Sequence, residues 1–507
     1  MSLHQVYLFL LAGAVILLVS VVAARLAYRI GLPVLLAFLA VGAFLGEDGL
    51  GLRFDNTALA QALGTAALAV ILVEGGLSTD LSLIRPVLVP ASVLATVGVL
   101  ISVAVVAVAA HVALHLPWQL ALLLGAVVSS TDAAAVFSVL RSLSLPRRLT
   151  GLLEAESGIN DAPSVILVVA LSTAAISGHG ALRLLVDLGY ELVVGAATGL
   201  AVGIGGVRLL RRLSLGTSGL HSLAVMAVGI LAFAAAGAAH ASGFLAAYVA
   251  SLILGNAGLP HRRATRSVAE GLGWIAQISL FVMLGLLVSP HELAASVVPA
   301  LLIGTVLLLA ARPLSILLCL TPFRVPPPEQ LFLSFAGLRG AVPIVLATIP
   351  VVARVPGSHQ LLNVVFVLVA IFILVQAPAL PWLARRLRLI PGTAGRELQV
   401  ETAPLDTIDA ELIELTIEPG SRLHGVEVFE LRLPEPCAVT LIVRDGHAFV
   451  PQPTTRLNTG DQLLVVATTA KRQAVERRLR AVARAGRLAA WYGETGDPDG
   501  PARLTFP

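Results

Sequence analysis

Three carboxylates lie close together in an apolar part of the chain, in the segment LLEAESGINDAPSV at residues 152–165. Pro163 leaves the carbonyl of Ile159 without its helical hydrogen bond, and Ser157 shares a helical face with Asp161 because it lies four residues earlier. A carboxylate, a hydroxyl and a free carbonyl form an oxygen-rich site that suits a hard monovalent cation. Burial disfavours the charged form of a carboxylate, so Asp161 could bind a proton at the same place. We therefore prefer an ion site over a purely structural hydrogen-bond hub.

A second polar cluster, VVSSTDAAAV at residues 127–136, interrupts another apolar stretch with hydroxyl side chains and Asp132. Asp132 could be a second ion-site carboxylate, or it could cap a helix that resumes after a break. Broken backbone leaves carbonyl and N–H groups free to face an ion. We expect Asp132 and Thr131 to contribute to the ion site.

Glu156 and Arg339 are interpreted together, because both lie within apolar stretches. An isolated guanidinium is implausible there, since it does not lose its charge. Glu156 shares a helical face with Asn160, next to the face of Asp161. We expect a structural Glu156–Arg339 ion pair with Asn160 close by. Arg312 is the rival partner, unless its long side chain extends toward water.

Two further carboxylates, Glu74 and Glu154, lie toward one end of their apolar stretches. Either could line a funnel that concentrates cations at a cytoplasmic entrance. For Glu154 a solvated helix face is an equally good explanation. The deeper position of Glu74 favours a functional role.

These groups belong to a chain that is 57% hydrophobic and only 13% charged. Soluble domains carry about 25% charged residues, so the composition indicates a membrane protein. A bilayer-crossing helix needs about 20 mostly apolar residues. Such runs predict thirteen spans, centred near residues 15, 38, 68, 98, 128, 163, 200, 229, 250, 280, 307, 341 and 372. Cys319 and Cys437 lie in different parts of the chain, so we expect no disulfide and no metal other than a monovalent cation.

The arginines divide unevenly between the two sides that thirteen spans create. Sixteen fall in loops on one side and three on the other. The side rich in basic residues faces the cytoplasm. We therefore expect a multi-pass protein of a bacterial inner membrane, with its N-terminus outside and its C-terminus in the cytoplasm.

An internal repeat appears when the two halves of the chain are compared. The segment Ala37–Leu50 resembles Ala247–Leu259 with one gap, and further matches recur at an offset of 209 residues. This offset spans seven predicted helices, an odd number, so the second copy must be inverted. The same offset relates the break at Thr131–Asp132 to Gly340–Ala341. Inverted repeats with discontinuous helices at corresponding positions are typical of transporters.

Three motifs, SSTDAAAV, ESGINDAPSV and GLRGAVP, resemble those of the NhaP-type branch of the cation:proton antiporter superfamily, which includes bacterial potassium/proton antiporters. The resemblance covers Met1 to about Arg388. It implies an all-α fold of thirteen helices in two inverted six-helix repeats, a homodimer, and elevator-type alternating access. One departure is Ala133, where many relatives have a proline.

The resemblance also implies roles for individual residues. Asp161 matches the carboxylate that binds ion and proton, Glu74 matches an acidic residue that reaches the site, and Glu156 with Arg339 matches the structural ion pair. Further ion-site positions are matched by Asp132, Thr131, Ser157 and Asn160. Relatives with two adjacent aspartates move net charge, so the Asn160–Asp161 pair resembles electroneutral one-to-one exchange.

The C-terminal part of the chain has a different composition. We expect a transmembrane domain at 1–388, a polar linker at 389–410, a small α+β domain at 411–485 and a poorly ordered tail at 486–507. Short strand patterns followed by an amphipathic helix resemble a TrkA-C (RCK-C) domain, over roughly Glu411 to Ala485. Such domains regulate potassium transport, and some bind nucleotides. A dimerising module without a ligand is an equally good interpretation.

The sequence thus predicts a secondary antiporter that exchanges K⁺, or Na⁺ in second place, for H⁺. We expect no enzymatic activity, no cofactor apart from these ions and a regulatory nucleotide, and no nucleic-acid partner; the partners are the lipid bilayer and a second copy of the chain. A Na⁺/H⁺ antiporter for pH and sodium homeostasis is the first alternative. An RCK-gated cation channel is the second, but no TVGYG-like filter occurs. A receptor with a vestigial transport core conflicts with the intact motif set.

Overall fold

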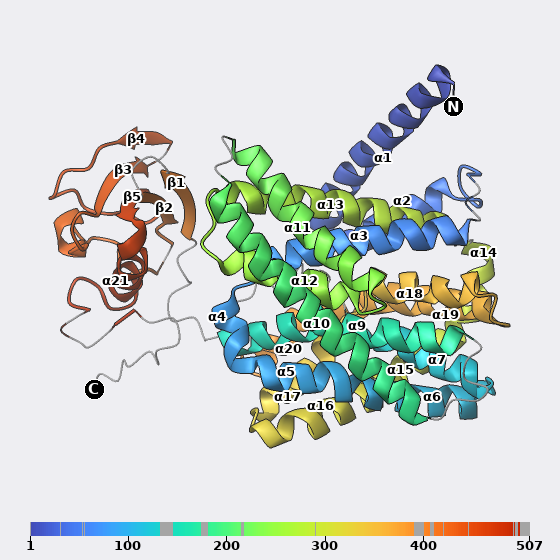
Figure 1. Ribbon diagram of the computed structural model, residues 1–507. Helices are drawn as coiled ribbons and strands as arrows, with labels where there is room; N and C mark the ends of the chain where they lie inside the picture. Colours follow the sequence, from blue (N-terminus) through green and yellow to red (C-terminus); the bar gives the residue numbers. More distant parts are fainter. Residues whose placement is uncertain are drawn as a thin grey trace. The chain divides into compact units, whose positions relative to one another are not determined.

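The computed structural model divides into two compact units, Met1–Leu389 and Ile390–Pro507. It describes residues 2–30, 32–52, 54, 56–131, 145–173, 181–213, 217–288, 290–389, 400–405, 410–418, 420–444, 446–489, 491 and 495–496. The first unit is helical throughout its described residues, and the second combines strands with one long helix (Figure 1).

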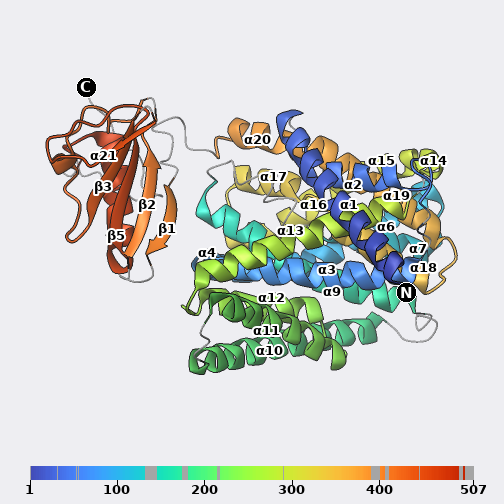
Figure 2. The same ribbon diagram turned by 90° about the horizontal axis from the view of Figure 1, so that it is seen from above.

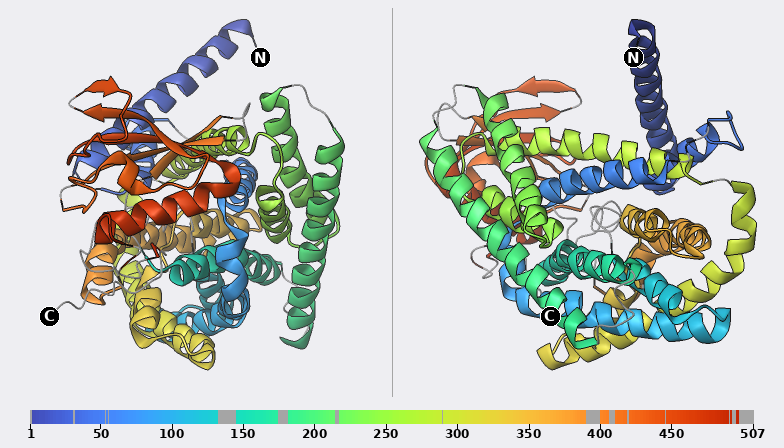
Figure 3. Two further views of the ribbon diagram at one scale, coloured as in Figure 1. Left: turned by 90° about the vertical axis from the view of Figure 1, so that its left-hand side faces the viewer. Right: turned by 45° about the vertical axis from the view of Figure 1, so that its right-hand side comes forward.

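The first half of the helical unit begins with two helices that precede the long helix α3. Its elements are α1 (Leu3–Ile30), α2 (Val34–Leu45), α3 (Thr57–Ser78), α4 (Leu81–Ile84), the 3₁₀ turn η1 (Arg85–Val87), α5 (Leu88–Val93), the π turn η2 (Leu94–Gly98), α6 (Val99–Leu114), α7 (Trp118–Ser129) and α9 (Arg147–Ser172). Helix α1 contacts α2, and most of its apolar side chains are exposed, as lipid contact requires. Its N-terminal end extends away from the other helices (Figure 3).

Helix α10 (Ala181–Arg212) connects this half to the second one. The second half contains α11 (Ser218–Ala238), α12 (Gly243–Asn256), α13 (Arg262–Leu286), α14 (Pro290–Leu293), η4 (Ala294–Ser296), α15 (Val297–Val306), the π turn η5 (Leu307–Ala311), α16 (Arg312–Leu320), η6 (Thr321–Phe323), α17 (Pro327–Ala336), α18 (Ala341–Val352), α19 (Ser358–Ile371), the π turn η7 (Phe372–Gln376) and α20 (Ala377–Arg386). Helices α10, α11 and α12 lie side by side (Figure 2).

The described helices agree with the predicted positions of the spans. Each of the thirteen predicted centres falls within a helical element. Eight of the described helices are long and apolar enough to cross a membrane, and the bent pair α17–α18 makes nine. Helices α2, α7 and α12 are apolar but shorter. A polytopic helical protein is therefore confirmed, whereas the number thirteen stays a prediction.

The order of elements in the two halves supports the predicted repeat. Helix α4 and turn η1 begin at Leu81 and Arg85, and their counterparts α14 and η4 begin at Pro290 and Ala294. Both starts are 209 residues apart, which is the offset found in the sequence. In each half a short helix, a π turn and a further helix follow.

Contacts between the halves are exchanged in a reciprocal way. Asn256, at the end of α12, accepts a hydrogen bond from the N–H of Leu81 at the start of α4 (3.0 Å). Asp48, which follows α2, accepts one from the N–H of His291 in α14 (2.8 Å). In the same way a Cβ at Gly76 would lie 2.8 Å from the Cβ of Ser251, and one at Gly285 would lie 2.8 Å from the Cα of Gly42. Such exchange is what an approximate twofold relation between the halves produces; the inversion of the second copy stays a prediction.

The second unit is built around a five-stranded antiparallel sheet in the order β1-β2-β5-β3-β4. Its strands are β1 (Val400–Leu405), β2 (Ala410–Thr416), β3 (Ala438–Arg444), β4 (His447–Phe449) and β5 (Gln462–Thr468). Ile413 pairs with Val465 in register, and both are buried. Helix α21 (Arg472–Ala485) buries Val475 and Leu479 in the same core, because residues four apart share a helical face.

Candidate ion-binding site

Helix α7 stops at a break that positions the first group of polar side chains. Ser129 ends the helix, and its hydroxyl donates to the carbonyl of Gly125 (2.6 Å). Ser130 has an extended backbone (φ −66°, ψ 138°), which frees its carbonyl from the helical pattern. Serine and threonine hydroxyls compete with backbone hydrogen bonds, so a run of three of them favours such a break. Helix α7 therefore ends where the sequence predicted a break, and the residues after Thr131 lie outside the described structure.

Helix α9 passes this break and contributes the carboxylate. The hydroxyl of Ser130 donates to Oδ1 of Asp161 (2.6 Å), and Thr131 Oγ1 lies 3.1 Å from Ser157 Oγ. The amide of Asn160 donates to the Thr131 hydroxyl. All five side chains are buried, and the carboxylate of Asp161 is the most exposed at 5%. The structure therefore brings together four of the residues predicted for the ion site, with Ser130 added to them.

Close packing fixes this part of α9 against α12. A Cβ at Gly158 would lie 2.4 Å from Cζ of Tyr248, so the tyrosine ring occupies the space that a side chain would need. Tyr248 is itself buried. Pro163 lies inside α9, as expected, two residues beyond Asp161. The helix can therefore place Asp161 beside the end of α7 without a long side chain intervening.

The structure corrects the predicted partner of Glu156. Arg312, not Arg339, binds it: NH1 donates to Oε1 (2.5 Å) and NH2 to Oε2 (3.3 Å). Arg312 NH2 also donates to the carbonyl of Leu333 (3.3 Å). The two charged side chains are 5% and 2% exposed as residues. Arg312 starts α16 directly after the π turn η5, and it points into the protein rather than toward water.

Arg339 takes a different position, in the break between α17 and α18. These two helices are bent by 51° to each other. Arg339 is fully buried, and its NH1 donates to the free carbonyl of Ser130 (2.9 Å). Its Nε and NH2 have no hydrogen-bond partner among the described residues. The arginine therefore joins the bent pair α17–α18 to the end of α7.

The remaining predicted residues lie elsewhere or outside the described structure. The carboxylate of Glu74 accepts a hydrogen bond from Ser78 (3.0 Å), and its methylene groups stand beside Gly273 on α13. Glu154 is half-buried one turn before the cluster, and its Oε2 has no hydrogen-bond partner in the described part of the chain. Asp132 and Ala133 belong to residues 132–144, which the structure does not describe.

Sequence reasoning did not identify two of the residues that the structure places here. Ser130 was present in the polar run that marked the break, but nothing in the spacing distinguished its hydroxyl from those beside it. Arg312 was considered only as a rival partner, because its depth suggested an exit toward water. The run of hydroxyl residues could thus have indicated Ser130 as a site residue. The orientation of Arg312 depends on the π turn before it, which the sequence pattern does not reveal.

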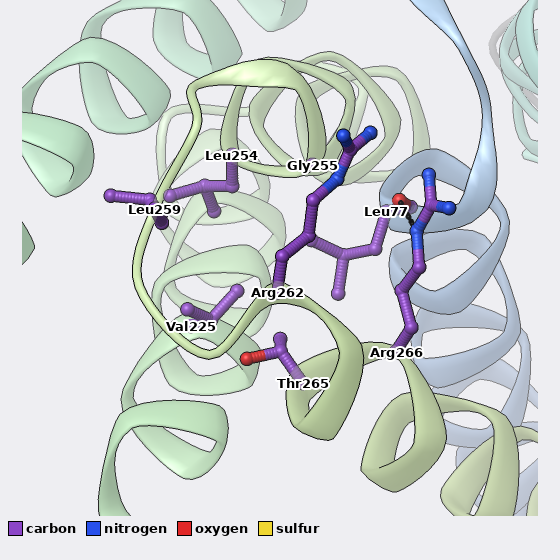
Figure 4. Close-up of a pocket in the computed structure, with 8 residues that line it drawn as sticks. All are labelled: Leu77, Val225, Leu254, Gly255, Leu259, Arg262, Thr265 and Arg266. Atoms are coloured by element: carbon purple, nitrogen blue, oxygen red, sulfur yellow. Dashed lines mark hydrogen bonds between the residues drawn. The ribbon is translucent and has the colours of Figure 1, made fainter. Parts of the chain in front are cut away.

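A separate shallow hollow, with room for little more than one water molecule, opens near the C-terminal end of α3, between α11, α12 and α13 (Figure 4). Arg262 and Arg266 line it, and Arg266 donates to the carbonyls of Leu77 (3.3 Å) and Ser78 (3.2 Å). These bonds cap the end of α3, where helical carbonyls lack partners. The lining residues of the described structure include none that was predicted for the ion site.

Comparisons with known proteins agree with the two-unit organisation. A family model described as "Sodium/hydrogen exchanger, transmembrane" matches residues 14–386, and one described as "TrkA-C domain" matches residues 412–480. The chain is 37% identical over 477 residues to a protein of Alkalimonas amylolytica named "K(+)/H(+) antiporter NhaP", covering 92% of this chain and 82% of that protein. It is 34% identical over 476 residues to "K(+)/H(+) antiporter NhaP2" of Shewanella baltica, with the same coverage.

More distant proteins resemble this chain as well. A Synechocystis protein named "Na(+)/H(+) antiporter NhaS2" is 28% identical over 368 residues, which is 70% of this chain and 67% of that protein. The solved structure of the sodium proton antiporter MjNhaP1 from Methanocaldococcus jannaschii at pH 8 superposes with a TM-score of 0.65. It is 20% identical and covers 76% of this chain and 99% of that one. This structural match supports the fold of the helical unit.

Proposed function

Because the chain belongs to the sodium/hydrogen exchanger family and carries a TrkA-C domain, we propose that it exchanges a monovalent cation, K⁺ in the first place, for H⁺ across the bacterial inner membrane. The family resemblance inferred from the three motifs is confirmed. This family consists of cation:proton antiporters, so the protein is a transporter and not an enzyme.

The relatives support potassium over sodium. The two relatives named as K(+)/H(+) antiporters match 92% of this chain at 37% and 34% identity. The relative named as a Na(+)/H(+) antiporter matches 70% of it at 28% identity. Exchange of Na⁺ for H⁺ is the second candidate, because the family model itself is described by that ion.

The observation that carries the proposal is the hydroxyl-bonded carboxylate of Asp161. It is buried where α9 passes the end of α7, and the Ser130 hydroxyl donates to it. The hydroxyls of the next residue, Thr131, and of Ser157 are hydrogen-bonded to each other. Oxygen ligands of this kind can replace the hydration shell of a monovalent cation. A proton can neutralise the same carboxylate, so cation and proton compete for one group. We assign Asp132, which follows Thr131 in sequence, to the same site.

Competition at one carboxylate explains coupled exchange. The site binds the cation on one side, turns to face the other side, releases the cation and returns with a proton. An empty, negatively charged site is costly to move through the low-dielectric interior, which suppresses uncoupled return. Relatives with two adjacent aspartates move net charge, and here Asn160 leaves Asp161 as the single carboxylate of that pair, so we propose one-to-one exchange without net charge. Alternating access by an elevator-type movement suits the bent pair α17–α18 and the break expected after α7.

The remaining roles follow from position and charge. The Glu156–Arg312 pair is structural: it neutralises two buried charges and ties α9 to α16. Arg339 organises the break after α7. Glu74 and Glu154 line the cytoplasmic approach. We also propose a homodimer with an outside N-terminus and cytoplasmic C-terminus, in which the TrkA-C domain regulates transport through a bound nucleotide or through dimerisation.

Cation-induced proton movement in inverted membrane vesicles tests this function. K⁺, Na⁺ and Li⁺ are compared at equal concentration, and we expect K⁺ to cause the largest proton movement at the lowest half-saturating concentration. Downhill cation flux without proton movement would support the channel instead. A larger response to Na⁺ would select the second candidate.

The site is tested by the Asp161→Asn variant in the same vesicles. The variant should lose all exchange because its side chain can neither bind a proton nor neutralise a cation. Asp187→Asn is the matched control, since it makes the same change at an exposed position of α10. Substantial exchange by Asp161→Asn would remove this carboxylate from the central role.

A further inference from the structure

Ser130, directly after α7, contacts both halves of the chain through two different groups. Its carbonyl accepts a hydrogen bond from Arg339 NH1 (2.9 Å), and its hydroxyl donates to Asp161 Oδ1 (2.6 Å). The residue is completely buried. The backbone of Ser130 is thus held by the second half of the chain, while its side chain contacts the exchanging carboxylate of the first half.

The geometry points to Ser130 as a further ion-site residue whose hydroxyl changes its hydrogen-bonding role with the occupancy of Asp161. A hydroxyl has one donor and two acceptor lone pairs. It can donate to the ionised carboxylate, accept from the protonated one, and offer a lone pair to a monovalent cation bound beside it. The substrate class is the monovalent cation of the proposed function, on which this inference rests.

The neighbouring hydroxyls are engaged differently. Thr131 accepts from the amide of Asn160 and shares a hydrogen bond with Ser157. Turning either hydroxyl therefore disturbs a second residue of the cluster. The Ser130 hydroxyl turns about a single side-chain bond, because its backbone position is already fixed by Arg339. It can follow the state of Asp161 without movement of the main chain.

The bland alternative is that Ser130 merely ends α7, as Ser129 does. Ser129 is also buried, but its hydroxyl donates back to Gly125 within its own helix. The two adjacent serines therefore provide a matched pair of alanine substitutions, each of which deletes one hydroxyl oxygen. At Ser130 the substitution removes a hydrogen bond to the carboxylate of Asp161, and at Ser129 it removes a hydrogen bond within α7. Only the first should change the affinity for the cation.

The experiment compares Ser130→Ala, Ser130→Thr and Ser129→Ala in vesicles that contain equal amounts of each variant. A hydrogen bond to a charged group is worth at least a tenfold change in an equilibrium constant. Ser130→Ala should therefore raise the KM for K⁺ about tenfold or more, with a smaller change in the maximal rate. Ser130→Thr, which keeps the hydroxyl, should restore a KM within about threefold of the wild type, and Ser129→Ala should leave it within about twofold.

A second measurement covers variants that accumulate poorly. The purified proteins are heated in detergent with KCl or with choline chloride, and the K⁺-dependent rise in thermal midpoint reports cation binding without transport. Ser130→Ala should lose most of this rise and Ser129→Ala should keep it. An unchanged KM or an unchanged K⁺ effect in Ser130→Ala overturns the inference.

The role of Ser130 and the proposed ion site are refuted by different results. If Ser130→Ala behaves as wild type while Asp161→Asn is inactive, only the role of Ser130 is refuted. If Asp161→Asn still exchanges ions, the proposed site itself is wrong. Equal losses in Ser129→Ala and Ser130→Ala would show that both serines act only on the break in α7.

Discussion

Replacement of Arg312 by alanine tests the Glu156–Arg312 ion pair, which the structure shows in place of the expected Glu156–Arg339 pair. Arg312 makes two contacts with Glu156, at 2.5 and 3.3 Å, and a third with the carbonyl of Leu333 at 3.3 Å. Alanine removes all three. Glu156, which is only 2% exposed, then loses the positively charged partner of its carboxylate, the guanidinium of Arg312. The expected result is a large loss of folded protein.

The size of the effect follows from burial rather than from the attraction between the charges. Breaking a buried ion pair by removing one partner costs about 3–5 kcal/mol, because the other charge stays buried. Replacing both partners by apolar groups of similar volume is often close to neutral. The double variant Arg312→Met/Glu156→Leu should therefore recover most of the stability that Arg312→Ala loses. The coupling between the two sites should be about 2 kcal/mol or more.

The assay is the amount and thermal midpoint of monodisperse protein after detergent extraction. Arg208→Ala is the control, since it removes an arginine that is exposed on α10. Arg312→Ala with the yield and midpoint of this control would refute the pair. The pair would also be refuted if the double variant lost more stability than the two single substitutions lose when their effects are added, because the coupling energy would then have the wrong sign.

Three further predictions concern other contacts. Asp461→Asn should cost the C-terminal unit about 2 kcal/mol at neutral pH. Burial raises the pKa of Asp461, but hydrogen bonds from an arginine and a backbone N–H outweigh it and hold the pKa below 3.8, so this stability is present above that value and lost as pH falls through the lowered pKa. The stability of this unit, measured by limited proteolysis at a series of acidic pH values, should therefore depend less on pH in the variant than in the wild type. Asn256→Ala should lower the thermal midpoint more than Asp48→Asn, which keeps an acceptor, and equal midpoints would count against the contact with α4. Gly158→Ala should reduce folded protein and Gly158→Ala/Tyr248→Leu should restore part of it, measured by extraction yield; a normal yield of the single variant would contradict the close packing.

The polar cluster around Asp161 was largely predictable from residue types and spacing, and its role as an ion site stays a proposal. Asp161, Ser157 and Thr131 were expected together, because a helical face and a broken segment placed their oxygen atoms in reach of one another, and the structure brings them together. The helical unit and the small strand-containing unit were also expected, since apolar runs and alternating strand patterns each extend over many residues. Such runs predict where a helix or strand lies in the chain, but they do not predict which side chains it contacts.

The pairing of Glu156 depended on information that the sequence does not display. A π turn contains one residue more than an α-helical turn, which rotates the following residues by about 100° around the helix axis. The π turn η5 ends at Ala311, directly before Arg312. An ideal helix through this region would point Arg312 in a different direction around the helix axis. The contact between Ser130 and Arg339 was missed for a related reason, because packing fixes how the bent pair α17–α18 meets the end of α7.

The reciprocal contacts of Asp48 and Asn256 bear on the proposed elevator-type movement. If the two equivalent halves exchange conformations in that movement, most of the packing energy is common to both states, and the remaining difference in free energy comes from positions at which the halves differ. Asp48 carries a charge whose pKa is lowered by hydrogen bonds from His291, whereas Asn256 is neutral. A fall in pH therefore weakens the contact of Asp48 with His291 but not the contact of Asn256 with Leu81. A difference of about 1.4 kcal/mol between them changes the ratio of the two populations tenfold, without any change at the ion site.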